Sequence, residues 1–198
     1  MKRLIAILTL AFFATSVAKA QNELKFGLTG GLLNNNTNID IGAFGFDIAS
    51  IDAINETGFY IGGFLDIAAS EKFHIQPELS YGKAGDLEFF YLPVMAKYYV
   101  VDRFNIQAGP QLSFSSNLND IKRSIRDIEG VIGTDANIDD VFRTTGVDLG
   151  VGLGFDITDQ FFAQARYAFE LTNRYKGPLN NSLEIKPQTL MVGVGFSF

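Results

Sequence analysis

Charged residues stand at alternate positions in several segments that are otherwise apolar. Both signs are represented, so side chains of this kind must pair with one another or remain hydrated if they share an enclosed space. We predict a cluster of Glu78, Lys97 and Arg166, and the alternative is a set of separate hydrated charges. The full set of charged residues in this pattern is Asp66, Glu78, Lys97, Asp148, Arg166 and Glu170.

Catalytic and metal-binding chemistry finds little support. His74 is the only histidine, which excludes a metal site with two imidazole ligands. We interpret it as a polar interior residue rather than a catalytic base. The stretch DANIDD at 135–140 begins like an EF-hand calcium loop, but Asp140 and Gly146 stand where that loop requires Gly and Glu. A loose surface Ca²⁺ site is the remaining alternative, so no catalytic residue, metal ligand or cofactor is predicted.

The elements that position these residues are strands, because apolar and polar residues alternate along the chain. Between Val147 and Ile157, large apolar side chains occupy one face, and acidic residues and glycines occupy the other. A tilted strand needs about nine to eleven residues to cross a bilayer, and most of the predicted strands reach that length. The pattern predicts eight strands, at residues 24–33, 58–67, 73–83, 89–100, 104–116, 145–157, 161–172 and 185–198.

The connections and the glycines indicate how such strands are arranged. Three connections are tight (AASEK, VDR and TDQ), whereas those at 34–57, 84–88, 117–144 and 173–184 are mostly longer. Short turns at one end and longer loops at the other are typical of outer-membrane barrels. Glycines occupy alternate positions at 150–154, and the lumen of an eight-stranded barrel is just wide enough for side chains to fill. Small residues on the inner face therefore leave room for long polar ones.

We therefore predict an all-β fold: a closed eight-stranded antiparallel up-and-down transmembrane β-barrel, apolar outside and polar inside, with short periplasmic turns and longer extracellular loops. Glu78 in the third strand and Arg166 in the seventh fall at similar heights on opposite walls. Lys97 in the fourth strand is expected near Glu78. The lumen is therefore predicted to be bridged by charged side chains rather than open.

Both ends of the chain have features of an exported protein. Residues 1–20 combine a basic start, an apolar stretch and AKA at the end, which predicts a cleaved signal peptide and a single domain at 21–198. The chain has no cysteine and a net charge of −6, so disulfides, a lipid-modified cysteine and a nucleic-acid partner are not expected. The last strand ends on Phe196 and Phe198, which resembles the signal read by the bacterial barrel-assembly machinery. We predict location in the cell outer membrane, with lipid and this machinery as partners.

The loop between residues 117 and 144 contains apolar residues at helical spacing, with basic residues between them. A short helix over the barrel mouth is expected there. It would either pack on the rim as a cap or bind a partner outside the cell, and both alternatives stay open. The apolar residues of this segment are Leu118, Ile121, Ile125 and Ile128.

The middle of the chain contains QPELSY at 76–81, YLP through KY at 91–98 and AGP at 108–110. These motifs, at this spacing, resemble the PorT-type outer-membrane β-barrel family, and the resemblance continues through VDLGVGLGFDI. One departure is YLP, where many members have one more residue before the proline. The resemblance implies an outer-membrane protein beta-barrel domain of eight strands, similar in architecture to small OmpA-like barrels. It also implies an association with a protein secretion system and implies no enzymatic activity.

The leading functional hypothesis is a non-enzymatic integral outer-membrane protein with a structural or interaction role. An accessory role in protein secretion or envelope integrity is its more specific form, with a secretion-system or surface partner bound through the outer loops. The alternative is a small channel or transport barrel. An outer-membrane enzyme and a soluble ligand-binding barrel are less favoured, the former because no His, Ser and acid set lies near the loop ends.

Overall fold

The computed structural model describes the backbone of residues 24–43, 46–116, 144–175 and 183–198. Side chains are described for residues 24–37, 55–115, 144–175 and 184–198. The predicted signal peptide at 1–20 lies outside the described residues. So does the predicted helix with its four apolar residues, Leu118, Ile121, Ile125 and Ile128, and so does DANIDD at 135–140.

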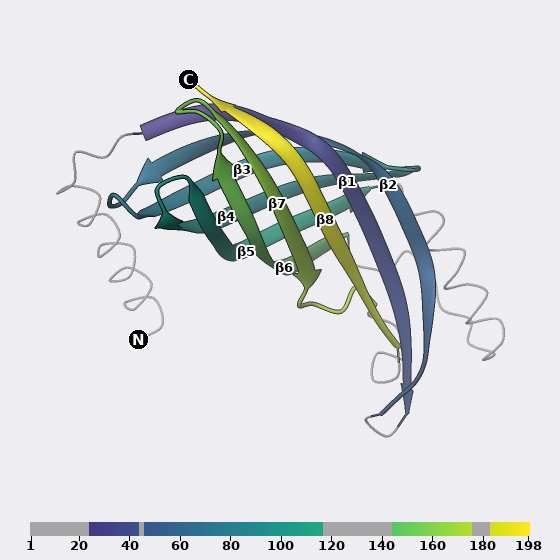
Figure 1. The fold of residues 1–198 in the computed structure, drawn as a ribbon. Helices are drawn as coiled ribbons and strands as arrows, with labels where there is room; N and C mark the ends of the chain where they lie inside the picture. The colour runs from purple at the N-terminus through teal and green to yellow at the C-terminus, as the bar shows by residue number, and fades with distance from the viewer. Residues whose placement is uncertain (1–23, 44–45, 117–143, 176–182) are drawn as a thin grey trace, which may run out of the picture.

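Eight antiparallel strands form one closed barrel, in which each strand pairs with its neighbours in sequence and β1 pairs with β8 (Figure 1). The predicted fold class and strand order are therefore confirmed. No helix in the described part of the chain is long and apolar enough to span a membrane. The strand bounds are β1 (Leu24–Ala43), β2 (Phe46–Ala68), β3 (Phe73–Ala84), β4 (Leu87–Val101), β5 (Phe104–Ser116), β6 (Thr145–Asp156), β7 (Phe161–Glu170) and β8 (Leu183–Ser197).

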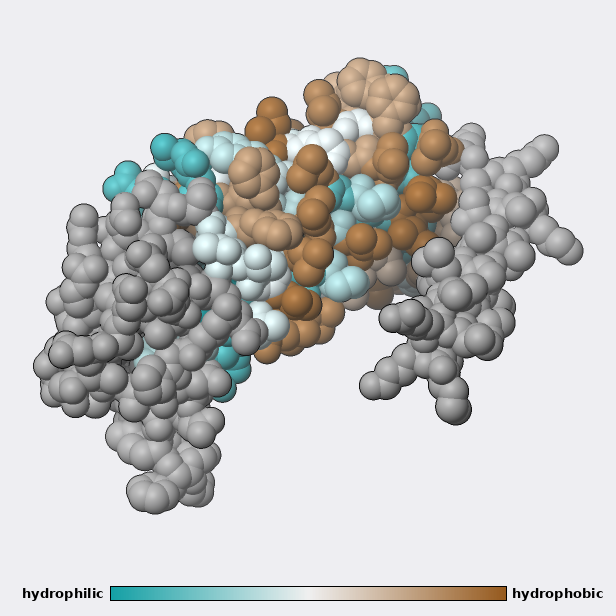
Figure 2. Space-filling view, turned by 180° about the vertical axis from the view of Figure 1, so that it is seen from behind, coloured by the Kyte–Doolittle hydropathy of each residue, from teal (hydrophilic) through white to brown (hydrophobic). Residues whose placement is uncertain are grey.

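The two faces of the barrel wall have opposite character, as the alternation predicts. In β6 the side chains of Val151 and Leu153 are 41% and 50% exposed, whereas Asp148 is 5% exposed. Large apolar residues gather on the outer surface of the strands in Figure 2. Because burial here is measured without lipid, an exposed apolar belt around a closed barrel is the surface that a bilayer would cover.

The barrel has a tight-turn end and a long-loop end. The turns at 69–72, 102–103 and 157–160 lie at the tight-turn end, with the first residue of β1 and the C-terminus. One connection at the other end is shorter than predicted, because Gly85 and Asp86 alone join β3 to β4. Gly85 has a φ of 58°, which a side chain would disfavour and which suits a tight hairpin turn.

The first two strands also differ from the prediction. Residues 34–57, predicted as a loop, instead continue β1 to Ala43 and begin β2 at Phe46. The run NNNTN has low strand propensity, but here the side chains of Asn35 and Thr37 form hydrogen bonds within the sheet. The side-chain Nδ2 of Asn35 donates to the Thr189 hydroxyl over 3.3 Å, and the Thr37 hydroxyl donates to Oδ1 of the Asn35 side chain over 3.1 Å. The loop prediction for this segment is therefore wrong.

The lengthened strands project beyond the rest of the barrel as a three-stranded sheet (Figure 1). Pairing between β2 and β3 begins at Gly58, and pairing between β7 and β8 reaches Gln188. Past these points only β1 remains paired on both sides, to β2 and to β8. We call residues 38–43, 46–57 and 183–187 the arm.

Candidate functional site: the filled lumen

A buried ion pair crosses the middle of the lumen. Arg166 in β7 donates from Nη1 to Oε2 of Glu78 in β3 over 2.6 Å, and its Nε donates to Gln107 Oε1 over 2.9 Å. The side chains of Arg166 and Glu78 are 6% and 1% exposed. Since β3 and β7 stand on opposite walls of an eight-stranded barrel, this pair bridges the interior. The structure thus brings together the two residues that the sequence places at one height.

Glycines make the space that these side chains occupy. A Cβ atom on Gly152 would lie 2.9 Å from Cγ of Arg166 on the neighbouring strand. A Cβ atom on Gly195 would lie 2.1 Å from Cζ of Phe162, which is itself buried. The inward glycines therefore fit the rings and long polar chains of the interior, as the narrow lumen requires.

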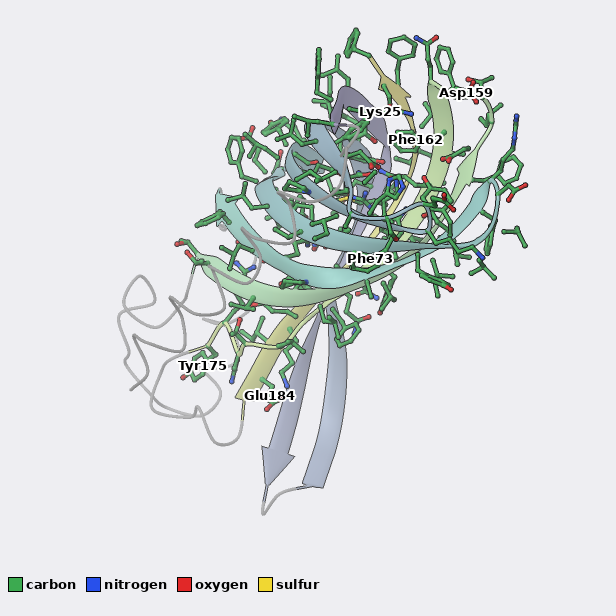
Figure 3. The ribbon with its side chains drawn as sticks, turned by 90° about the vertical axis from the view of Figure 1, so that its left-hand side faces the viewer. Lys25, Phe73, Asp159, Phe162, Tyr175 and Glu184 are labelled. Atoms are coloured by element: carbon green, nitrogen blue, oxygen red, sulfur yellow. The ribbon has the colours of Figure 1, made fainter. Side chains whose placement is uncertain are left out.

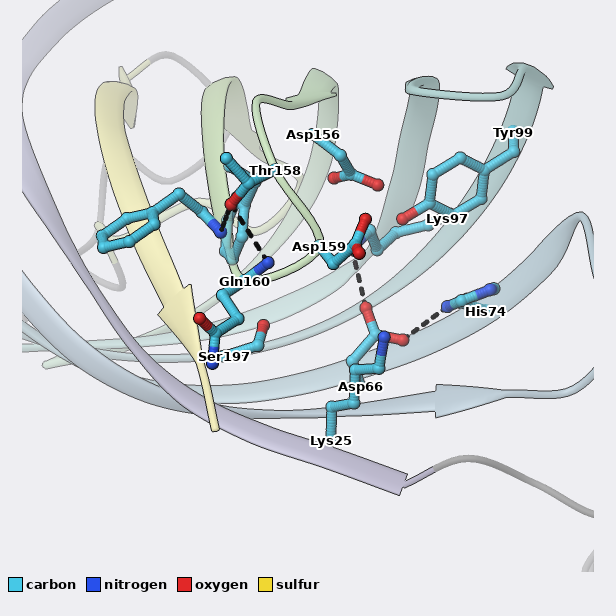
Figure 4. Close-up of a pocket in the computed structure, with 12 residues that line it drawn as sticks. Lys25, Asp66, His74, Lys97, Tyr99, Asp156, Thr158, Asp159, Gln160 and Ser197 are labelled. Atoms are coloured by element: carbon cyan, nitrogen blue, oxygen red, sulfur yellow. Dashed lines mark hydrogen bonds and ion pairs between the residues drawn. The ribbon is translucent and has the colours of Figure 1, made fainter.

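A second cluster lies nearer the tight-turn end. Lys97 in β4 donates to Asp66 Oδ2 over 2.7 Å and to Gln76 Oε1 over 3.0 Å. His74 Nδ1 lies 2.5 Å from Asp66 Oδ1, and Figure 4 shows Asp66 between the two basic residues. Lys97 was expected next to Glu78, but the strand register places it opposite His74 and hence beside Asp66. Gln76 connects the two clusters, because its amide reaches Glu78 at 3.5 Å.

A third cluster closes the long-loop end. Asp148 accepts hydrogen bonds from Gln111 Nε2 at 2.7 Å and from the Ser113 hydroxyl at 3.0 Å. Glu170, at the end of β7, pairs with Nε of Arg174 at 2.7 Å. Asp148 and Glu170 are direct neighbours across the β6 and β7 pair, so both acids face one space.

Arg174 is the interior residue that the sequence analysis missed. It follows β7 in the connection to β8, yet it is only 1% exposed. Its Nη atoms donate to the hydroxyls of Ser115 at 2.6 Å and Ser113 at 2.8 Å. The only sequence signal was a basic residue four places after Glu170, in a segment predicted as loop. The segment after β7, in which Tyr175 is labelled in Figure 3, therefore places the Arg174 guanidinium in the mouth of the barrel.

Two small cavities adjoin the second and third clusters. A cavity beside Tyr91 and Arg174 measures about 10 Å³, and another beside Lys97 and Phe162 measures about 50 Å³. A cavity must offer about 10–15 Å³ to hold one water molecule, so the smaller space admits about one water and the larger one only a few. A wider hollow of about 980 Å³ lies at the rim of the tight-turn end, where Glu71 and Lys72 line it.

Two expectations concern the chain end and metal binding. Phe196 and Phe198 belong to an aromatic group on the outer face, in which Phe198 stacks on Phe26 at 5.2 Å and Phe196 lies 4.8 Å from Phe161, measured between ring centroids. Their role as an assembly signal stays a prediction.

Among the residues that the structure describes, no group of three or more His, Cys, Asp or Glu side chains could hold a metal ion.

This architecture, a closed barrel with an apolar outside and a charged, filled inside, is that of a small outer-membrane barrel. The chain belongs to the outer membrane protein beta-barrel domain family, whose model matches residues 5–198. The family places the protein in the outer membrane. We therefore take the tight-turn end as periplasmic and the long-loop end as external.

Solved structures of other outer-membrane barrels are similar over most of the chain. Ail, the attachment invasion locus protein of Yersinia pestis, is 16% identical, with 88% of this chain and 98% of that chain covered and a TM-score of 0.45. Neisserial surface protein A is 14% identical, with 87% and 97% covered and a TM-score of 0.46. OprG from Pseudomonas aeruginosa is 12% identical, with 88% and 95% covered and a TM-score of 0.42. No curated protein matches the sequence significantly. At these scores the likeness adds nothing to the fold assignment, which rests on the strand pairing and the family match.

Proposed function

We propose that the protein is a sealed, non-enzymatic outer-membrane barrel that anchors an external interaction surface, in an accessory role in protein secretion or envelope integrity. The observation that carries the proposal is the ion pair between Glu78 and Arg166, which spans the lumen at 2.6 Å. A conducting path along the barrel axis would have to pass this pair.

The energetics of the pair favour a closed lumen. Separating a buried ion pair leaves uncompensated charges in a poorly solvated space, at a cost of about 3–5 kcal/mol when one partner is lost. Arg166 is further fixed by Gln107, and Glu78 by the Ser80 hydroxyl. The clusters around Asp66 and Glu170 close the lumen again on either side. Three successive polar layers therefore support a structural role over transport.

The non-enzymatic part of the proposal is supported by how the polar side chains are used. His74 is engaged by Asp66, whose second oxygen is bound by Lys97, and the imidazole ring lies 4.9 Å from the ring of Tyr99. Ser113 and Ser115, at the outer mouth, are bound by Arg174. The hydroxyls of Ser113 and Ser115 thus lie at the opposite end of the barrel from the imidazole, where they cannot act together with it.

The secretion-linked form of the proposal is supported by the resemblance to PorT-type barrels in QPELSY and AGP. The same proposal includes export with cleavage of residues 1–20. The mass of the protein isolated from outer membranes tests this cleavage. Retention of residues 1–20 in that protein would contradict cleavage.

Conductance tests the sealed lumen. Protein purified from outer membranes is inserted into planar bilayers, and we expect no steady single-channel currents. Steady currents of uniform size would contradict the proposal and establish the small channel in its place. A well-known porin inserted in the same bilayers serves as the positive control.

A further inference from the structure

The arm has two outer edges, and the chain covers one of them itself. On β8, the N–H of Ile185 donates to Asn173 Oδ1 over 3.0 Å, and its carbonyl oxygen accepts from the N–H of Arg174 over 3.0 Å. Pro187, two residues later, has no N–H to offer a further strand. Covering an edge and placing a proline on it are two ways in which proteins prevent unwanted strand addition.

Among the residues that the structure describes, none covers the edge of β2 in this way. In the described part of the chain no strand pairs with the outer side of residues 46–57, because β3 joins β2 only from Gly58. The segment reads FDIASIDAINET, with neither proline nor lysine. Register shifts leave Ala53 and Ile48 as extra residues against β1, so the regular stretches are 49–52 and 54–57. These stretches present backbone donors and acceptors to the solvent.

The charge of the hairpin formed by β1 and β2 indicates what could occupy this edge. No basic residue occurs between Lys25 and Lys72, whereas the hairpin of β1 and β2 contains Asp40, Asp47, Asp52 and Glu56. Two copies paired through this edge would bring like charges together, which is unfavourable across strands. A partner strand with basic side chains would place opposite charges there instead.

We propose that the outer edge of β2, at residues 49–57, is a docking site for an extended segment of another protein that carries basic side chains. The segment adds to the sheet as a fourth strand of the arm, so that backbone hydrogen bonds supply affinity and charge supplies selectivity. The inference rests on the proposed function in one respect, the external position of the arm. Figure 3 shows the tips of β1 and β2 continuing past the labelled Glu184, clear of the other strands.

Binding of synthetic peptides to the full-length protein in lipid nanodiscs tests the proposal. The probe is a nine-residue peptide of alternating lysine and valine with a fluorescent label, and binding is followed by anisotropy. Methylation of alternate backbone nitrogens of the peptide keeps its charge and side chains but removes its hydrogen bonds to the edge of β2. We therefore expect the methylated peptide to bind with at least about a tenfold lower affinity. Equal affinity of the methylated peptide, or no binding of the unmethylated one, overturns the proposal.

Charge variants locate the site. In the double variant Asp52→Asn with Glu56→Gln we expect about a threefold to tenfold weaker binding, because two opposite-charge pairs are lost. Glu71→Gln, an exposed acid at the other end of β2, is the matched control and should bind as the wild type does. An equal loss in both variants shows binding elsewhere and overturns the proposal.

Backbone variants test strand addition itself. Ser50 and Ile51 are adjacent in a regular stretch, so the N–H of one points to β1 and that of the other points outward. Ser50→Pro and Ile51→Pro are made separately, and heat-modifiable gel migration identifies the variant whose barrel is intact. We expect one variant that keeps its fold and loses peptide binding. Wild-type binding in both, or light scattering that shows a dimer abolished by either proline, overturns the proposal.

Conductance separates this inference from the proposed function. A sealed barrel that does not bind the peptide refutes the docking site alone. A conducting barrel that binds the peptide refutes the sealed lumen alone.

Discussion

The barrel body and the arm share three strands but differ in what stabilises them. In the body the strands enclose side chains, and buried pairs such as Glu78 with Arg166 join opposite walls. In the arm the same β1, β2 and β8 form one open sheet held by backbone pairing, with β1 in the middle. The difference indicates that enclosed side-chain contacts stabilise the body, whereas the arm leaves one described strand edge unpaired.

The largest expected difference in stability between a body variant and an arm variant involves the central ion pair of Glu78 and Arg166. Arg166→Ala leaves Glu78 as an unpaired buried charge and should lower the free energy of unfolding by about 3–5 kcal/mol. Glu56→Ala, an exposed acid of the arm, should change it by no more than about 0.5 kcal/mol. Urea unfolding in detergent, followed by far-UV circular dichroism, measures both variants. Equal effects would remove the energetic distinction between body and arm.

A variant of Arg174 tests whether the segment after β7 contributes to the stability of the barrel body. Arg174→Gln removes the ion pair with Glu170 but keeps some hydrogen-bonding capacity, so we expect a loss of about 2–3 kcal/mol. Lys186→Gln is the matched control on β8, where Lys186 pairs with Glu184 in a half-exposed setting. The same unfolding assay applies, and a loss for Arg174→Gln no larger than that of the control would show that the mouth is only loosely closed.

Substitution of an inward glycine should cause a loss of stability of intermediate size. Gly195→Ala places a methyl group against the ring of Phe162 and should cost about 1–3 kcal/mol by overpacking. Gly63→Ala faces outward, where the nearest atom to the new Cβ is 3.8 Å away, and should have little effect. Phe162→Leu combined with Gly195→Ala should recover part of the loss. Two glycine variants of equal stability would contradict a filled lumen.

The smallest expected effect lies where the arm joins the body. Asn35→Ala removes its hydrogen bonds with Thr189 and Thr37 and should cost about 1 kcal/mol. Amide hydrogen exchange of β1 beyond residue 37 should rise more than exchange of residues 24–33. Uniform exchange along β1 would show that arm and body unfold as one unit.

The same comparison shows which features the sequence could predict. The body alternates between lipid and a narrow polar interior, so each strand there has a strict pattern of apolar and polar residues, as in β6. The positions of Glu78 and Arg166 follow from that pattern. Where the arm joins the body, the polar side chains of Asn35 and Thr37 form hydrogen bonds inside the sheet, and nothing in the composition of NNNTN indicates a strand. Local propensity favoured a loop there, and pairing with β2 and β8 overrides it.

Two details of the lumen also depended on long-range geometry. The register of β3 against β4 decides that Lys97 pairs with Asp66 rather than with Glu78, because it places Lys97 opposite His74, four residues before Glu78. Burial of Arg174 depends on how the segment after β7 folds back over the mouth, and no periodicity marks such a segment. The alternation of apolar and polar residues within each strand could therefore be predicted from the sequence. Contacts that depend on strand register or on irregular segments could not.

The assignment of the two faces of the wall supports every conclusion about location and lumen, and spin labelling tests it directly. The chain has no cysteine, so single substitutions at Val151 and Ser113 carry one nitroxide label each in lipid nanodiscs. We predict that oxygen, which concentrates in lipid, relaxes the label at Val151 strongly and the label at Ser113 weakly. Strong oxygen relaxation at Ser113 with weak relaxation at Val151 would contradict the account.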